Sequence, residues 1–210
     1  MRRVPQIVLA ATLLLGSGTS ASAWVQSTSS KGAPLHWSDP CHTVYAHMDG
    51  SDDVEGAGGM EAIRLSLEAW NEVDCSGFTF LWAGLTNMSW VGYSVHGGNA
   101  NVVIFREEAW PYHQRPVAFT SVTYDPVTGE IMDADLELNG EDYAFTALEH
   151  GVPGAVDIRN TVTHEAGHML GLDHSPKVAS TMYKSSILGE TVKRSLDDDD
   201  VEGVCHVYPA

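Results

Sequence analysis

The segment THEAGHMLGLDHS, Thr163–Ser175, most constrains what this chain can fold into, because it places three histidines and a glutamate within thirteen residues. On a helix, His164 and His168 lie one turn apart and project from the same face, so their ring nitrogens can meet one ion. Crowded imidazoles repel each other when protonated and are costly to bury when neutral, and a shared metal ion removes both problems. The segment therefore predicts a metal-binding helix.

The residues that follow His168 predict a third ligand and an open position on the metal. Gly171 comes three residues later, where glycine readily adopts the left-handed conformation that ends a helix, so the chain can turn back and bring in His174. Three neutral imidazoles leave a zinc ion one position for water, which the metal activates for attack on a carbonyl group. Glu165 projects about 100° round the helix from His164, so we expect it to accept a proton from that water rather than to bind the metal.

Several segments resemble one known family. HEAGHMLGLDHS looks like the long zinc motif of the metzincin metallopeptidases, and Ser175 after the third histidine is the matrixin variant of that motif. Met182 matches the methionine turn that lies beneath the zinc ligands in this family, and SLDDDDVEGVCHVYP is similar to the matrixin C-terminal helix. AFTSVTYDPVTGEIMDADLELN resembles the edge-strand hairpin of secreted bacterial matrixin-like proteins. The resemblance covers Thr43–Pro209 and implies an α+β catalytic domain with a twisted, mixed five-stranded sheet, three helices and a zinc cleft.

This resemblance implies a secreted zinc endopeptidase that hydrolyses peptide bonds of extended protein substrates, with Glu165 as general base. The substrate would add as a strand to the edge strand Val117–Tyr124, and segment Ser180–Ser186 would wall the main specificity pocket. The residues placed along the substrate are Ala118, Phe119 and Thr120 on the strand and Tyr183 in the pocket wall. Two alternatives stay open: a non-catalytic zinc-binding or adhesive protein on the same scaffold, and a processing protease of narrow specificity.

Hydrophobic periodicity and turn residues predict the remaining elements. We expect strands at Thr43–Met48, Phe78–Trp82, Asn101–Phe105, Val117–Tyr124 and Ile131–Leu138, and helices at Gly59–Val73, from about Val156, and near Asp197–Tyr208. A long Gly-rich loop separates the second and third strands. The acids of SLDDDD are interpreted as caps for the free N–H groups of the last helix.

The predicted sheet carries residues that bear on further metal sites. Asp133, Asp135 and Glu137 alternate along one strand and therefore share one face, which we interpret as a solvated face, with calcium binding as the alternative. Matrixins usually also hold a second, structural zinc. Val117 and Ile131 stand at positions where histidine ligands would be needed, which argues against that second zinc.

The N-terminal residues have the layout of a secretory signal peptide. Arg2 and Arg3 precede the apolar run Ile7–Leu15, and the small residues Ala21–Ala23 offer a cleavage site. We therefore predict a signal peptide at residues 1–23, an N-terminal arm at 24–40 and a catalytic domain at 41–210.

Net charge and cysteine content indicate which partners and which cellular location are compatible with this chain. The net charge of −17 disfavours nucleic acid and anionic membranes as partners, and we expect an extracellular monomer. Three cysteines in an exported chain predict one disulfide and one free thiol. Cys41 and Cys75 are the predicted pair, which leaves Cys205 free.

Overall fold

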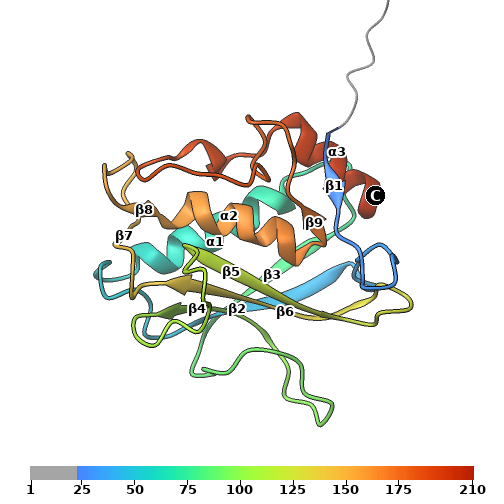
Figure 1. Ribbon diagram of the computed structural model, residues 1–210, viewed down its shortest axis with the longest axis horizontal. Helices are drawn as coiled ribbons and strands as arrows, with labels where there is room; N and C mark the ends of the chain where they lie inside the picture. Colours follow the sequence, from blue (N-terminus) through green and yellow to red (C-terminus); the bar gives the residue numbers. More distant parts are fainter. Residues whose placement is uncertain (1–22) are drawn as a thin grey trace, which may run out of the picture.

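The computed structural model describes residues 23–210, so nearly all of the predicted signal peptide lies outside the described residues. Figure 1 shows two layers, with α-helices above a sheet and a long loop below it. The elements are β1 (Val25–Gln26), β2 (Cys41–His47), α1 (Gly58–Asn71), β3 (Thr79–Thr86), β4 (Asn101–Arg106), β5 (Ala118–Tyr124), β6 (Ile131–Asn139), β7 (Phe145–Thr146), β8 (Val156–Asp157), α2 (Ile158–Met169), β9 (Leu172–Asp173), the 3-10 helix η1 (Val192–Arg194) and α3 (Asp198–Val207).

The central sheet has five strands in the order β3-β2-β4-β6-β5. Neighbouring strands run parallel except β5, which pairs antiparallel with β6 and forms one edge of the sheet. The predicted α+β fold, with a mixed five-stranded sheet and three α-helices, is confirmed. None of the helices within residues 23–210 is long and apolar enough to cross a membrane.

Helices α1 and α2 lie side by side on one face of the sheet (Figure 1). The predicted apolar face of α1 is buried, with Ile63, Leu67 and Trp70 each at most 1% exposed. The indole N–H of Trp70 donates to the carbonyl oxygen of Thr163 at 2.9 Å, so α1 fixes the helix that carries the zinc motif. The core therefore forms a rigid base beneath that motif.

The face of β6 that points away from the helices is buried, contrary to the prediction of a solvated face. Asp133, Asp135 and Glu137 do share a face, but each is only 1% exposed, so the face is not solvated. The loop between β3 and β4 covers it, and the backbone N–H of Gly92 in this loop donates to Asp135 at 2.6 Å. Arg106 on β4 pairs with Glu137 at 2.6 Å. The strand periodicity identified the face correctly but did not show what covers it.

The predicted pairing of Cys41 with Cys75 is wrong. Cys75 instead forms a disulfide with Cys205 of α3, with their Cα atoms 5.4 Å apart, and Cys41 is free and exposed. The C-terminal segment returns to the end of α1, where the N–H of Gly77 donates to the carbonyl oxygen of Tyr208 at 2.8 Å. The bond thus joins two segments that are distant in sequence and adjacent in the fold.

Candidate metal centre

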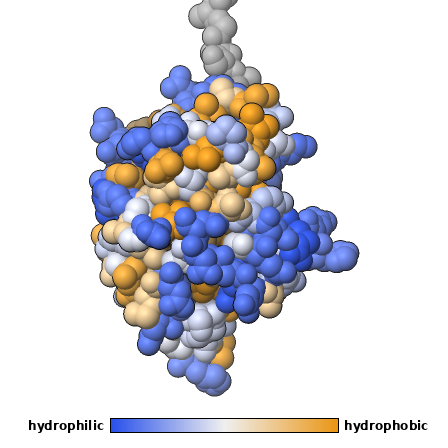
Figure 2. Space-filling view, turned by 90° about the vertical axis from the view of Figure 1, so that its left-hand side faces the viewer, coloured by the Kyte–Doolittle hydropathy of each residue, from blue (hydrophilic) through white to orange (hydrophobic). Residues whose placement is uncertain are grey.

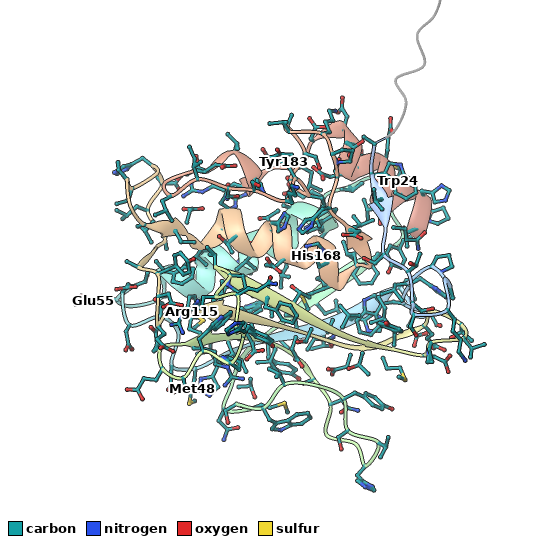
Figure 3. The ribbon with its side chains drawn as sticks, viewed as in Figure 1. Trp24, Met48, Glu55, Arg115, His168 and Tyr183 are labelled. Atoms are coloured by element: carbon teal, nitrogen blue, oxygen red, sulfur yellow. A yellow bond between two sulfur atoms is a disulfide. The ribbon has the colours of Figure 1, made fainter. Side chains whose placement is uncertain are left out.

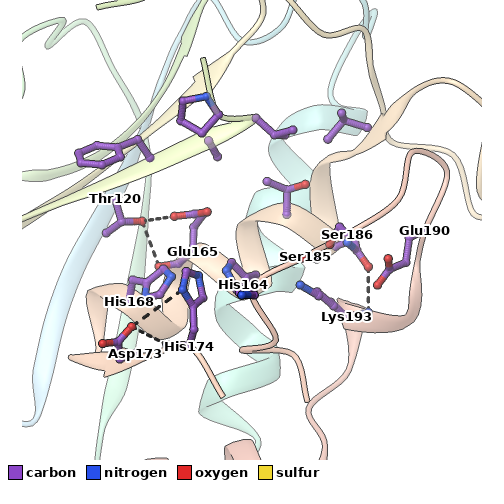
Figure 4. Close-up of a pocket in the computed structure, with 18 of the residues that line it drawn as sticks. Thr120, His164, Glu165, His168, Asp173, His174, Ser185, Ser186, Glu190 and Lys193 are labelled. Atoms are coloured by element: carbon purple, nitrogen blue, oxygen red, sulfur yellow. Dashed lines mark hydrogen bonds and ion pairs between the residues drawn. The ribbon is translucent and has the colours of Figure 1, made fainter. Parts of the chain in front are cut away.

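The three histidines of the motif converge beside the sheet edge. His164 and His168 lie one turn apart on α2, and their ligating atoms and that of His174 all lie within 4.8 Å of one another. Figure 4 shows the three rings pointing toward one another. Gly171 makes the turn between them with φ of +84°, and a Cβ there would approach the carbonyl oxygen of Leu35 to 2.6 Å. Only glycine satisfies both conditions at this position.

Backbone carbonyl groups orient two of the imidazoles. Nδ1 of His164 lies 2.6 Å from the carbonyl oxygen of Thr181, and Nδ1 of His168 lies 2.8 Å from that of Leu172. A carbonyl oxygen accepts only an N–H, so Nδ1 carries the proton in both rings and the lone pair of Nε2 is left for a metal. Burial, followed by repulsion from His168, holds the pKa of His164 well below its ordinary value, and the pKa of His174 is lowered for the same reasons. Neutral imidazoles are the form that binds zinc.

Glu165 faces the cleft next to these rings. Its carboxylate accepts a hydrogen bond of 2.7 Å from the hydroxyl of Thr120, which lies on β5 (Figure 4). Because the same hydroxyl also contacts the carbonyl oxygen of Glu165 at 3.2 Å, the edge strand fixes the side chain relative to its own helix. The carboxylate therefore has a defined position beside the histidines without being one of the three converging groups.

The segment beneath the histidines is packed closely. Met182 is 2% exposed, and a Cβ added to Gly167 of α2 would come within 2.2 Å of its sulfur atom. Trp70 lies against the same point, at 2.9 Å from that Cβ position. Glycine at 167 is therefore required for the helix to approach the turn that carries Met182.

The acids at the start of α3 do more than the predicted capping. Asp197 and Asp200 form a reciprocal capping box, as expected for a helix N-terminus. Asp200 also accepts backbone N–H groups from Thr181 at 2.7 Å and Met182 at 3.0 Å. Asp199 accepts the hydroxyl of Ser175, the residue after the third histidine, at 2.6 Å. These buried carboxylates hold both segments that flank the histidines.

A cleft of about 910 Å³ runs past the three histidines. It lies between the edge strand β5 and the segment after Met182; in Figure 3, Tyr183 and Arg115 lie on opposite sides of His168. Figure 2 views the end of the molecule where β7 and β8 lie and shows hydrophobic residues gathered in its upper half among hydrophilic ones.

Comparison with known proteins agrees with this geometry. A family model described as Matrixin matches residues 36–209. The chain belongs to the matrixin family. Metalloendoproteinase 1-MMP of Arabidopsis thaliana is 46% identical over 93 residues, which make up 40% of this chain and 25% of that protein. Metalloendoproteinase 2-MMP of the same plant is 37% identical over 90 residues, or 41% and 22% of the two chains. Matrix metalloproteinase-27 of Tupaia belangeri is 26% identical over 166 residues, or 79% and 29%. This matrixin thus spans less than a third of the length of these relatives.

The matrixin cleft contains most of the residues singled out from the sequence. Its lining includes the three histidines, Glu165, and Ala118, Phe119 and Thr120 of β5. The opposite wall is formed by residues 184–188, and Tyr183, expected in that wall, is not among the residues that line the cleft. Its carbonyl oxygen instead accepts a hydrogen bond from the ammonium of Lys193. Sequence patterns missed Asp199, Asp200 and Lys193 as parts of the site, because each reaches it through a contact that no local spacing reveals.

Proposed function

We propose that this matrixin is a zinc-dependent endopeptidase that hydrolyses peptide bonds in extended segments of protein substrates. The observation that supports it most is the pairing of three converging imidazoles, two with Nδ1 held by carbonyl groups, with a carboxylate held beside them. Bound by His164, His168 and His174, a zinc ion would lower the pKa of water to about 7 and polarise the carbonyl group of the peptide.

Glu165 is the proton carrier in this proposal. Its carboxylate accepts a proton from the water that attacks the peptide carbonyl and then donates it to the departing amine. The hydrogen bond from Thr120 keeps the carboxylate turned toward the cleft through both transfers. A carboxylate free to rotate would spend part of its time out of reach of the reacting atoms.

The edge strand β5 would align the substrate. Among the described residues, β5 pairs with a strand only on its β6 side, so its other side presents backbone groups toward the cleft. An extended peptide can add to such an edge by main-chain hydrogen bonds, which do not depend on the side chains of the peptide. Residues 184–188 would enclose the substrate from the opposite side.

Cleavage of casein with and without a chelator, by wild type and by Glu165→Gln, tests the proposal. We expect the variant to keep its zinc, because the three histidines are intact, and to lose at least about a hundredfold in turnover, since general-base groups contribute that much or more. The exposed Glu149 provides a matched control, and Glu149→Gln should cut casein like wild type. Equal cleavage by wild type and Glu165→Gln would contradict the role given to Glu165, whereas no cleavage by wild type would favour the non-catalytic alternative.

We also propose that residues 1–23 direct export and are removed, that 24–40 form an arm, and that 41–210 form the catalytic domain of an extracellular monomer. In support, the arm packs on the domain, because β1 within it pairs antiparallel with β9, which precedes His174. Mass spectrometry of protein from the culture medium would give the mature N-terminus. Metal analysis of the same sample should give one zinc per chain, whereas a second zinc or bound calcium would change the proposed metal content.

A further inference from the structure

Lys193 is a buried cation at the edge of the cleft. It lies on η1, is 4% exposed and lines the cleft, whereas the other lysines of residues 23–210, namely Lys31, Lys177 and Lys184, are exposed. Its ammonium donates to the carbonyl oxygen of Tyr183, and within residues 23–210 it forms no ion pair with a carboxylate. An ammonium group has three N–H donors, so two remain for a partner in the cleft.

The surroundings of this ammonium are polar. Figure 4 shows the side chain of Lys193 directed toward His164, with Ser185, Ser186 and Glu190 on the same side of the site. Asn160 and Thr161 of α2 line this part of the cleft as well. Hydroxyl, amide and charged groups therefore surround the space beside the first histidine, and a large apolar side chain entering it would leave these groups without water or partners.

The charges near Lys193 are only partly balanced. Burial lowers its pKa, and the carboxylates of Glu190, Glu165 and Asp200 oppose that decrease from a distance. Glu190 accepts a hydrogen bond of 3.0 Å from the backbone N–H of Ile187, so its carboxylate is held against the loop backbone rather than against the ammonium of Lys193. A buried cation without a close carboxylate is costly, and a carboxylate that arrives with the substrate would reduce this cost.

We propose that Lys193 makes this matrixin prefer an acidic side chain, glutamate or aspartate, at the substrate residue next to the scissile bond. The proposal rests on the endopeptidase function proposed above. A carboxylate entering the cleft forms with the ammonium of Lys193 a hydrogen bond in which both partners are charged, whereas the isosteric amide of glutamine is a neutral acceptor and forms a weaker one. We expect the added charge on the acceptor to appear as a preference of about tenfold or more in kcat/KM.

Fluorogenic peptides that differ only in one residue test this preference. Sets with Glu, Gln or Leu on either side of the scissile bond are cut with the zinc-loaded protein, and mass spectrometry locates each cut. We expect kcat/KM to be about tenfold higher for Glu than for Gln at one of the two positions. The ratio is taken within each protein, so it does not depend on the fraction that is folded.

Variants of Lys193 test whether its ammonium group causes the Glu-to-Gln ratio of kcat/KM. In Lys193→Met the Glu-to-Gln ratio should fall to about one and the Leu peptide should gain, whereas Lys193→Arg should keep a preference for Glu. Lys31→Met is the matched control, because Lys31 is an exposed lysine that does not line the cleft, and the ratio should persist. A wild-type ratio near one, or an unchanged ratio in Lys193→Met, overturns the proposal.

A binding measurement separates this proposal from the endopeptidase function. Fluorescence anisotropy of the same peptides on Glu165→Gln requires no turnover, and the Glu peptide should bind about tenfold more tightly than the Gln peptide. Equal affinities overturn the role of Lys193. If wild type cuts no peptide while the difference in affinity is present, the endopeptidase function fails and the selectivity of Lys193 stands.

Discussion

Removing the disulfide should cost much of the stability of this fold. Cys75 and Cys205 are separated by 130 residues, and closing a loop of that length removes conformational entropy from the unfolded chain worth about 5 kcal/mol at 25 °C. The folded protein retains other contacts between the same segments, such as the 2.8 Å hydrogen bond from Gly77 to Tyr208. These contacts act in the folded state and do not replace a constraint on the unfolded state. We therefore expect Cys75→Ala/Cys205→Ala to lose about 3 to 5 kcal/mol.

Guanidinium unfolding followed by tryptophan fluorescence measures this loss, and Cys41→Ala is the matched control. Cys41 is exposed and unpaired, so its replacement should change the free energy of unfolding by less than about 0.5 kcal/mol. Thiol titration of the denatured, unreduced protein should find one thiol in wild type and none in Cys41→Ala. A loss below about 1 kcal/mol in the double variant, or a comparable loss in Cys41→Ala, would refute the entropic argument and the pairing.

Three further predictions concern the helix of the zinc motif, the edge strand and the buried acidic face of β6. Gly167→Ala should destabilise the protein by about 1 to 3 kcal/mol and reduce its zinc content, because the new Cβ meets the sulfur of Met182 at 2.2 Å; thermal unfolding and metal analysis would show both effects. Thr120→Val should lower kcat about fivefold to tenfold with little change in KM, since one hydrogen bond that holds Glu165 is lost; equal kcat for variant and wild type would remove that role. Burial and a neighbouring carboxylate raise the pKa of Asp133 to about 7. Between about pH 4 and pH 7 the folded state therefore keeps a proton that the unfolded state has released. The free energy of unfolding consequently falls as the pH rises to about 7. Asp133→Asn has no such titrating group, so urea unfolding should show its stability rising relative to wild type between about pH 4 and pH 7, and a difference independent of pH would contradict the shift.

The sequence predicted features that depend on local spacing. The helical repeat alone brings His164 and His168 to one face, and Gly171 marks the turn that the structure shows with positive φ. The strands of the hairpin were placed to within a residue, as Ala118–Tyr124 and Ile131–Asn139, because alternation and turn residues are local signals.

What the sequence did not reveal depends on contacts between distant segments. Thr120 and Glu165 are 45 positions apart, and no periodicity links them. Asp135 belongs to an alternating polar pattern that is typical of an exposed strand face, yet the loop between β3 and β4 covers it. The pairing of Cys75 with Cys205 likewise required knowing where the last helix docks.

The hydrogen bonds that Asp200 accepts from the turn beneath the histidines make the histidine site depend on residues far beyond the zinc motif. A chain shortened before Asp197 would retain His164, His168, His174 and Glu165, but the peptide segment whose carbonyl at Thr181 orients the first ring would lose its anchor. Damage to the C-terminal helix by a protease would therefore disturb the histidine site without a cut near it, so the metal content of a sample would report whether this distant helix is intact.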